Sequence, residues 1–457
     1  MPAVHISRST FYSGLMMVLW VSGCSVSPSQ PDYQQQIDAE SATVSPWQNS
    51  ADAVAVSNLN DLIEAPAVMP LVDAALENNP GLQQTLLTLQ ILEKQLTISE
   101  AASLPAVSAG FGASRSEDSD TTFNSDLSVS WQADLWGQLD DLETAAQQDI
   151  QQQTLLLQSA RDTLAAEVIK SWLTLIAQQR ASDIEQQRLQ SLQQTESFIL
   201  ERYQLGLGLL EDLDSARSAV ASSEARLTAL QENQRQQHLL LRTLLGQTQL
   251  PSLDEVPETY PAVLLPIADL PEQTLSRRPD LRAAYVAISA AELRTDAAYK
   301  DLLPRLDFQA ILQDVARSPR AALFAAPAWS LLGQLTAPLY EGGQRKATAE
   351  INELQTAIAY QDYRDQLLTA VTEIEQALSF EQALQSQQQS VETALASAEN
   401  NLQQYQAGYQ SGLRTILDLL TVQQQNFDLK AQRDDLIYQR LLNRINLGLA
   451  LGMEINA

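Results

Sequence analysis

The chain has 457 residues, of which 45% are hydrophobic but only 6% aromatic, and its formal net charge is −28. A composition rich in Leu, Ala, Gln, Glu and Ser with few aromatic residues is typical of long helices rather than of several compact domains. The acidic balance excludes nucleic acid as a partner, because phosphate binding requires clustered Lys and Arg. It is compatible with a solvated surface or with a conduit that favours cations.

Residues 1–23 predict a secretory signal peptide, with a weakly positive start, a short apolar run and small residues at its end. The stretch VSGC that closes at Cys24 resembles a bacterial lipobox, in which the Cys thiol receives a diacylglyceryl group. Cys24 is the only Cys, which excludes a disulfide within the chain and a multi-thiolate metal site. A free or buried Cys that happens to follow the signal peptide is the alternative. Ser25 in place of Asp favours the outer membrane, by resemblance to sorted lipoproteins.

Residues 24–60 are polar, aperiodic and contain Pro, so we expect a lipid-anchored extended segment. Two copies of one unit follow, repeat 1 at 61–250 and repeat 2 at 271–457, joined by a Pro-rich linker at 251–270. The copies are marked by matching residues at fixed offsets. Pro80 and Pro279 are 199 positions apart, and the pairs Tyr203 and Tyr409, Gly206 and Gly412, and Asp212 and Asp418 are each 206 apart.

Each repeat begins with a helix that stops at a Leu-Pro pair, after which the apolar period changes from 3.6 to 2. We predict a β-hairpin at about 106–135 in repeat 1 and at about 305–339 in repeat 2. Around Val129, apolar residues alternate with Ser and Gln, which predicts one apolar and one polar face. Strands of about ten residues can cross a bilayer when tilted. Two soluble hairpins with one wet face are the alternative.

Long helical runs without Pro follow the hairpins, at about 138–202 and 343–407. Some sixty residues in an α-helix extend about 90 Å, and the apolar spacing is like that of a coiled coil. Tip turns are expected at about 203–209 and 409–415, because a Gly can adopt the helix-terminating conformation that other residues adopt at a cost. A helix of about 35 residues returns from each turn.

The chain shows no sign of an enzyme, a cofactor or a metal site. The expected mature chain keeps one His, His238 on a Gln-rich helix, which is read as a solvated or packing residue. There is no Gly-rich phosphate loop, no HExxH and no Ser nucleophile motif.

Four strands cannot close a barrel, and open edges are not tolerated in lipid. Strands must therefore be pooled between subunits, and three copies would supply twelve, an even number within the known range. We therefore expect a mainly α fold with a β-barrel part: a long helical coiled-coil tunnel and a transmembrane β-barrel shared between three protomers.

The lipobox, the doubled order of elements and the phrases RPDL, DLWG and PLYEGG resemble those of TolC-like outer-membrane efflux proteins, in the lipoprotein branch of tripartite efflux pumps. The resemblance covers the chain from Cys24 to about Gly452. It implies a homotrimer lipid-anchored in the outer membrane of a Gram-negative bacterium, with its helical tunnel in the periplasm. Its implied partners are outer-membrane lipid, a periplasmic adaptor and an inner-membrane transporter of the resistance-nodulation-division type. Small molecules such as drugs, toxic compounds or metal ions would pass through it without covalent chemistry.

The resemblance also assigns roles to residues of the doubled phrase, which forms the periplasmic tip in this family. Asp212 resembles a lock acid held by a Tyr and an Arg of the other repeat, for which the counterparts are Tyr409 and Arg414, and Asp418 resembles an acid that narrows the pore. A second acid one turn later is replaced by Thr421, so a doubled acidic ring is not assured. Exposed helix faces without a gating role are the alternative. The turn residues expected to contact the adaptor are Gly206, Leu207, Gly412 and Leu413.

Two other functions are compatible with the sequence. The same duct would serve type I protein secretion, although secretion ducts of this family are commonly without lipid. A periplasmic coiled-coil scaffold lipoprotein without a channel is the second.

Overall fold

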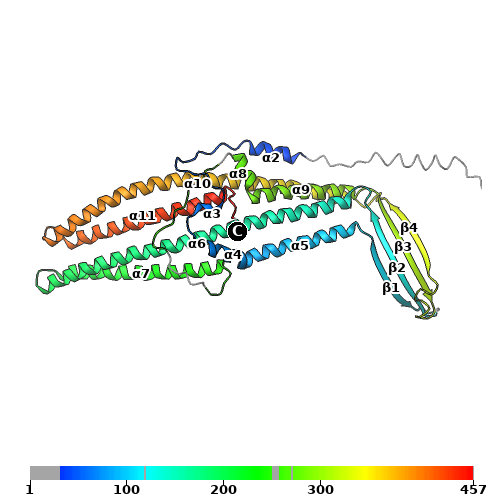
Figure 1. Cartoon of the computed structure of the whole chain (residues 1–457), viewed down its shortest axis with the longest axis horizontal. Coiled ribbons are helices and arrows are strands. Elements are labelled where there is room, and N and C mark those ends of the chain that lie inside the picture. Colours follow the sequence, from blue (N-terminus) through cyan, green and yellow to red (C-terminus); the bar gives the residue numbers. More distant parts are fainter. Residues whose placement is uncertain (1–30, 118–119, 250–256, 269–270, 456–457) are drawn as a thin grey trace, which may run out of the picture. The chain divides into compact units, whose positions relative to one another are not determined.

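The computed structural model describes residues 31–117, 120–249, 257–268 and 271–455. Its elements in chain order (Figure 1) are α2 (Tyr33–Ser41), α3 (Leu59–Leu62), α4 (Met69–Asn78), α5 (Pro80–Ala102), β1 (Ala106–Ser114), β2 (Thr122–Ala133), α6 (Gln138–Gln204), α7 (Leu210–Leu244), α8 (Pro271–Arg277), α9 (Pro279–Lys300), β3 (Arg305–Ala316), β4 (Ala328–Thr336), α10 (Gln344–Gln410) and α11 (Ile416–Ala450). No helix in these ranges is both long and apolar enough to cross a membrane. The mainly helical fold with an internal repeat is as expected.

The chain forms two compact units. Of the described residues, the sheet unit comprises those within 31–36, 89–152 and 284–363, and the helix-pair unit comprises those within 37–88, 153–283 and 364–455.

The sheet unit holds one four-stranded antiparallel sheet in the order β1-β2-β3-β4. Its central pair, β2 and β3, joins the first repeat to the second. Trp131 lies opposite Phe308 in this pair, and their rings stack with centroids 5.7 Å apart. Within the described sheet β1 and β4 are the edge strands, so each presents a row of backbone groups without a strand partner.

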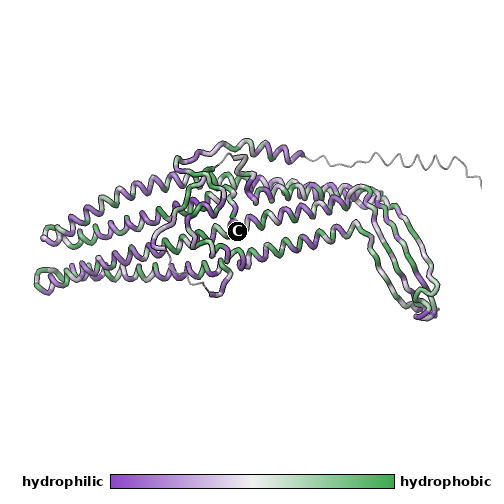
Figure 2. The backbone as a smooth tube through the Cα atoms, viewed as in Figure 1, coloured by the Kyte–Doolittle hydropathy of each residue, from purple (hydrophilic) through white to green (hydrophobic). Residues whose placement is uncertain are grey.

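The unbroken strand register gives the sheet two distinct faces. Side chains alternate across a strand, and the hydropathy colours alternate with them along β1 to β4 (Figure 2). The apolar face carries Val107, Ala109, Phe111, Ala113, Phe123, Leu127, Val129, Trp131, Ala133, Leu306, Phe308, Ala310, Leu312, Ala316, Trp329, Leu331 and Leu335. The opposite face holds mainly Ser, Asn, Gln, Asp and Thr. Many apolar side chains are exposed in the single chain, including those of Leu331 and Trp329, at 71% and 79%.

Aromatic pairs occupy both ends of the apolar face. Phe111 and Phe123 stack near the hairpin tips, with centroids 6.4 Å apart, while Trp131 and Phe308 stack near the helices. Phe123 and Trp131 are separated by eight residues of one strand, or about 26 Å along it. At the tilt of about 35–45° usual in outer-membrane barrels, this strand length spans roughly 20 Å of height, most of the apolar band of about 25 Å between their aromatic girdles.

The DLWG phrase builds the junction between β2 and α6. The carboxylate of Asp134 accepts hydrogen bonds from the backbone N–H groups of Gln138, Leu139 and Asp140 at 2.8 to 3.0 Å, which satisfies donors that a helix start leaves without partners. The indole N–H of Trp136 donates to the carbonyl oxygen of Pro304 at 2.7 Å. The junction therefore fixes where the first hairpin meets the second repeat.

Two long helix pairs come from the two repeats. α6 and α10 have 67 residues each, and α7 and α11 have 35 each. Their bounds are separated by 206 positions at both ends. A helix of 67 residues is about 100 Å long. In Figure 1, α7 lies alongside α6 and α11 alongside α10.

The hydrophobic core of the helix-pair unit includes the described part of the linker between the repeats. Val263 and Leu265 of this strap, residues 257–268, are 3% and 5% exposed. The N–H of Leu264 donates to Leu62, and that of Val54 donates to Leu265, both at 2.8 Å. The strap is therefore packed into the core rather than passing over it.

The expected extended N-terminal segment is wrong for residues 33–41, which form helix α2. Tyr33 and Ile37 lie one helical turn apart and are 7% and 5% exposed. The ring of Tyr33 packs on that of Tyr360, with centroids 4.9 Å apart. This packing provides the stability that a short polar helix lacks in isolation.

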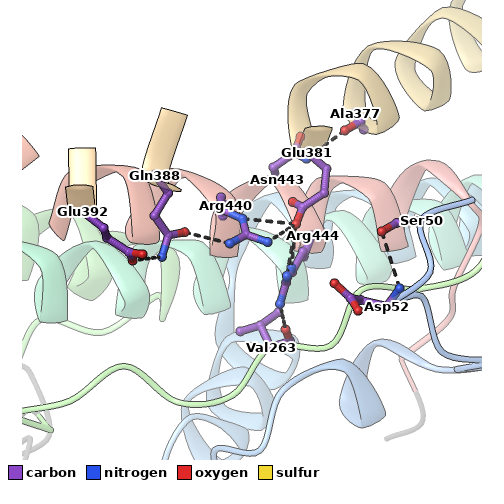
Figure 3. A network of polar contacts seen from close by, with 10 residues as sticks. All are labelled: Ser50, Asp52, Val263, Ala377, Glu381, Gln388, Glu392, Arg440, Asn443 and Arg444. Atoms are coloured by element: carbon purple, nitrogen blue, oxygen red, sulfur yellow. Dashed lines mark hydrogen bonds and ion pairs between the residues drawn. The ribbon is translucent and has the colours of Figure 1, made fainter. Parts of the chain in front are cut away.

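A buried carboxylate joins α10 to α11 (Figure 3). Glu381 Oε1 accepts hydrogen bonds from Arg440 Nη2 at 2.8 Å and from Arg444 Nη2 at 3.0 Å. The side chain of Glu381 is only 4% exposed. Arg444 also donates to the carbonyl oxygen of Val263, and Arg440 to Gln388. The network therefore connects the second helix pair to the strap.

Candidate functional site: the two helix turns

The two tip turns have the same backbone conformation. Gly206 and Gly412 both have φ = 75°, in the left-handed region that favours glycine. In the first turn the N–H of Leu207 donates to the carbonyl oxygen of Arg202 at 2.8 Å. In the second the N–H of Leu413 donates to that of Gly408, also at 2.8 Å. These bonds, with glycine between them, form the Schellman motif that ends a helix.

The helices that leave the turns begin differently. Thr415 caps α11: its hydroxyl accepts the N–H of Asp418 at 3.2 Å and donates to the carboxylate of Asp418 at 2.7 Å. These hydrogen bonds hold the pKa of Asp418 below its usual range. α7 begins after Leu209, which has no side chain that can cap. Asp212 occupies the position of Asp418 but is not drawn into a cap.

Residues of both turns share one hydrophobic cluster. Ile199, Leu213 and Ala216 of the first repeat pack with Tyr409, Ile416 and Leu419 of the second. The two turns therefore pack side by side, as a lock between the repeats requires.

Tyr409 lies in this cluster and is 7% exposed. The guanidinium of Arg202 lies over its ring at 5.5 Å, and Phe198 meets it edge to face at 5.9 Å. Burial raises the pKa of Tyr409, and the nearby charge of Asp212 raises it further. Asp212 directly precedes Leu213, which packs in the same cluster as Tyr409.

Arg414 lies over the ring of Tyr405, 4.5 Å from its centroid. In the described part of the single chain, the close ion pairs do not include one between Arg414 and Asp212. Of the expected lock residues Asp212, Tyr409 and Arg414, the structure places Tyr409 and Arg414 against aromatic rings. The expected pore acid, Asp418, lies in the helix cap of α11.

The turns expose apolar side chains. In the first turn these are Leu205, Leu207, Leu209 and Leu210, and in the second Leu413 and Leu417, with exposures from 52% to 81%. Such a contiguous group of leucines is typical of a surface that contacts another protein. Leu207 and Leu413 are the two that the sequence singled out.

Sequence reasoning missed the capping role of Asp418, although Thr and Asp three positions apart follow the spacing of a capping box. It also missed the buried Glu381. The only sequence signal for this residue is an acidic side chain within a helix that must pack against another helix. Cys24 lies outside the described residues. Among those described, no group of three or more His, Cys, Asp and Glu is placed to hold a metal ion.

The sequence profile of the outer membrane efflux proteins matches residues 71–247 and 270–453, one match in each repeat. The chain belongs to the outer membrane efflux protein family. Membership of this family accounts for the amphipathic sheet, the long helix pairs and the two matching turns together.

Two curated members of this family are similar over nearly the whole chain. The pyoverdine export outer membrane protein OpmQ of Pseudomonas putida is 27% identical over 433 residues, which cover 89% of this chain and 90% of OpmQ. The cation efflux system protein CusC of Escherichia coli O157:H7 is 26% identical, covering 95% of this chain and 97% of CusC. The solved outer-membrane channel OprN has the same fold, with a TM-score of 0.83, 22% identity and coverage of 94% and 99%.

Proposed function

We propose that this outer membrane efflux protein is the exit duct of a tripartite efflux system and works as a homotrimer. It receives small molecules from an inner-membrane transporter of the resistance-nodulation-division type through a periplasmic adaptor, and releases them outside the cell. The names of its relatives OpmQ and CusC, which specify pyoverdine export and cation efflux, support small cargo rather than secreted protein.

The observation that carries this proposal is the sheet with one apolar face and two free edges. In water the exposed apolar face would promote aggregation, whereas in a membrane it faces lipid. The edge strands β1 and β4 run antiparallel, so β4 of one copy can pair with β1 of the next in a closed ring. Three copies give twelve strands and leave no edge in the bilayer.

The helices that adjoin the edge strands support the same ring. α5 directly precedes β1 in the chain and exposes Ile91 and Ile98, at 57% and 71%. α10 comes directly after β4 in the chain and exposes Ile351, Leu354 and Ile358, at 54% to 64%. Each set lies along one helix face, at spacings of seven or of three and four residues. Pairing of these stripes between neighbouring copies would bury both.

The turns supply the periplasmic gate and the adaptor contact. Tyr409 packs in a cluster formed by residues of both repeats. Opening of the gate must therefore either break the packing between α7 and α11 at this cluster or move the two helices as one body. Asp212 supplies a charge beside Tyr409, and Asp418 a charge at the start of α11. The exposed leucines around Gly206 and Gly412, including Leu207 and Leu413, are the surface that we assign to the adaptor.

Lipid attachment at Cys24 completes the proposed arrangement. Cys24→Ser should accumulate as a precursor that keeps its signal peptide, which mass spectrometry of the membrane fraction would detect. Normal cleavage of the wild-type chain without an acyl mass would contradict this part. The barrel should hold the trimer in the membrane without the anchor.

Two adjacent leucines of β4 give a matched test of the barrel. Leu331 lies on the apolar face and Leu332 on the polar face, and both are well exposed, at 71% and 51%. Arginine on the lipid face near the midplane costs about 2 to 4 kcal/mol, whereas a lumen position tolerates it. We expect Leu331→Arg to abolish heat-labile trimers in the outer membrane, while Leu332→Arg forms trimers with altered ion selectivity in planar bilayers.

The same experiment separates the alternatives. Equal trimer yields for the two variants would exclude a barrel with this register. A periplasmic scaffold would tolerate both changes and give no conductance. The row that contains Leu331 continues through Ala310 to Val129, so Val129→Arg should repeat the Leu331→Arg result and Ser128→Arg should not.

A further inference from the structure

The loop between β3 and β4, residues 317–327, folds back onto the apolar face of the sheet. The hydroxyl of Ser125 on β2 donates to the carbonyl oxygen of Ala322 in the loop. The carboxylate of Asp314 on β3 accepts the N–H of Ala326 at 2.9 Å. Ser125 and Asp314 are register partners and are the polar side chains among the strand positions of this face. The loop buries both, to 3% and 6% exposure, and Ala322 to 0%.

The loop thus covers a polar pair that would otherwise face lipid, and it lies against that lipid-facing surface itself. Leu323 and Phe324 on its outside are 62% and 41% exposed. Phe324 has φ = 54°, a conformation that costs free energy for a residue with a Cβ and is kept only where the surroundings impose it. Two bulky apolar side chains are therefore presented at the hairpin-tip end of the sheet, the end at which Phe111 and Phe123 stack.

Two arginines accompany these apolar side chains. The loop contains Arg317 and Arg320 and no acid, in a chain whose net charge is −28. Both are exposed, and among the described residues Arg317 forms a loose pair with Asp120, at 3.5 Å between exposed groups. Such a pair contributes little stability. The combination of apolar side chains and guanidinium groups matches a lipid whose headgroup carries phosphate.

We propose that the β3–β4 loop is an anchor for the outer leaflet, in which Leu323 and Phe324 enter the acyl layer while Arg317 and Arg320 bind phosphate groups of outer-leaflet lipid. This inference rests on the proposed barrel, because the barrel places the apolar face in lipid and the hairpin tips at the cell surface. The loop of the first hairpin has no comparable set, since Glu117 and Asp120 accompany its Arg115. The anchor therefore belongs to the second repeat.

The experiment uses the full-length trimer in detergent with diphosphorylated lipid A as the probe, and measures trimer melting and bound lipid by native mass spectrometry. The wild-type trimer should melt at a higher temperature with the probe and retain it. Each arginine near a phosphate-bearing surface contributes about fivefold in affinity, so Arg317→Gln with Arg320→Gln should weaken binding about 25-fold. Arg305→Gln, at the other end of β3, is the matched control and should bind as wild type.

Dephosphorylated lipid A and inorganic phosphate distinguish the contributions. The proposal requires weaker stabilisation by the former and none by the latter. Equal binding by the double variant, or equal stabilisation by inorganic phosphate alone, would overturn it. Leu323→Ser with Phe324→Ser should also weaken binding, while leaving the conductance of the trimer unchanged. Trimers that conduct normally but show no arginine-dependent lipid binding would refute the anchor and leave the duct standing, whereas a wild-type chain that forms no conducting trimer would refute the duct.

Discussion

The helices of the second pair begin and end 206 positions after those of the first, and the two turns have the same conformation. The two pairs nevertheless differ in their charged residues. At the turns, Thr415 draws Asp418 into a capping box, whereas Leu209 leaves Asp212 without one. Farther along, Glu381 of α10 is buried between arginines, while its counterpart in α6 is the fully buried Leu175. Glycine and apolar periodicity therefore set the duplicated backbone, while a few polar residues and their contacts differ between the two copies.

The largest effect is expected where the second pair is made like the first. Glu381→Leu would leave Arg440 and Arg444 partly buried without their carboxylate, which costs about 3 to 5 kcal/mol. The melting temperature of the trimer in detergent should fall sharply. Adding Arg440→Gln and Arg444→His, the residues found 206 positions earlier, should recover most of the loss. If the single change melted like wild type, the network would not support the helix pair.

A second difference concerns Asp162 of α6, whose counterpart 206 positions later is the exposed Leu368. Burial raises the pKa of Asp162 to about 6, although its carboxylate accepts the N–H of Ile455 at 2.9 Å. Because the pKa of Asp162 is raised in the folded state, its protonation adds to the free energy of unfolding. This contribution is fully present below the unfolded pKa near 3.8 and is lost as the pH rises through about 6.

Asp162→Asn should therefore remove a pH-dependent term of at most about 3 kcal/mol. Compared with wild type, the variant should gain stability at pH 7.5 and lose its advantage near pH 4.5, as measured by trimer melting across this range. Asp73→Asn, at an exposed position, is the control. Parallel melting profiles for wild type and Asp162→Asn would contradict the prediction.

A double variant of the proposed gate residues tests whether the two turns cooperate. Tyr409→Phe with Arg414→Ser removes a buried hydroxyl and a cation–π contact of about 0.5 to 2 kcal/mol per protomer. We expect higher single-channel conductance in planar bilayers and sensitivity of cells to large antibiotics such as vancomycin. Arg235→Ser, an exposed arginine of α7, should change neither. Normal conductance in trimeric double variants would place the gate elsewhere.

The smallest effect is expected from exchanging the caps. Thr415→Leu should cost about 1 kcal/mol at the start of α11 and release Asp418. Leu209→Thr should capture Asp212 in a new capping box and draw it away from Tyr409. In planar bilayers the first variant should increase cation preference, and the second should raise conductance slightly. Asp418→Ala should reduce cation preference. Unchanged cation preference in Thr415→Leu and Asp418→Ala, together with unchanged conductance in Leu209→Thr, would deny these acids a role in the pore.

Much of this fold was predictable because its signals are local. The alternation around Val129, the glycines at the turns and the fixed offset of 206 follow from residue type and spacing alone. Helix α2 was not predictable, because the packing of Tyr33 on Tyr360 brings together residues more than 300 positions apart. The placement of Arg414 over Tyr405 instead of against Asp212 likewise depends on side-chain packing that no spacing records.

The pairing of Trp131 with Phe308 has a consequence for the order of folding. These neighbours in the sheet are 177 positions apart in the chain, so β2 cannot complete its ladder until the second repeat is synthesised and exported. Contacts between distant residues form slowly because the intervening chain must first be closed into a loop. The first hairpin therefore waits in the periplasm with its apolar face uncovered and is exposed to aggregation during that interval. We expect an outer membrane efflux protein built in this way to be most prone to aggregation for as long as its own second half is missing.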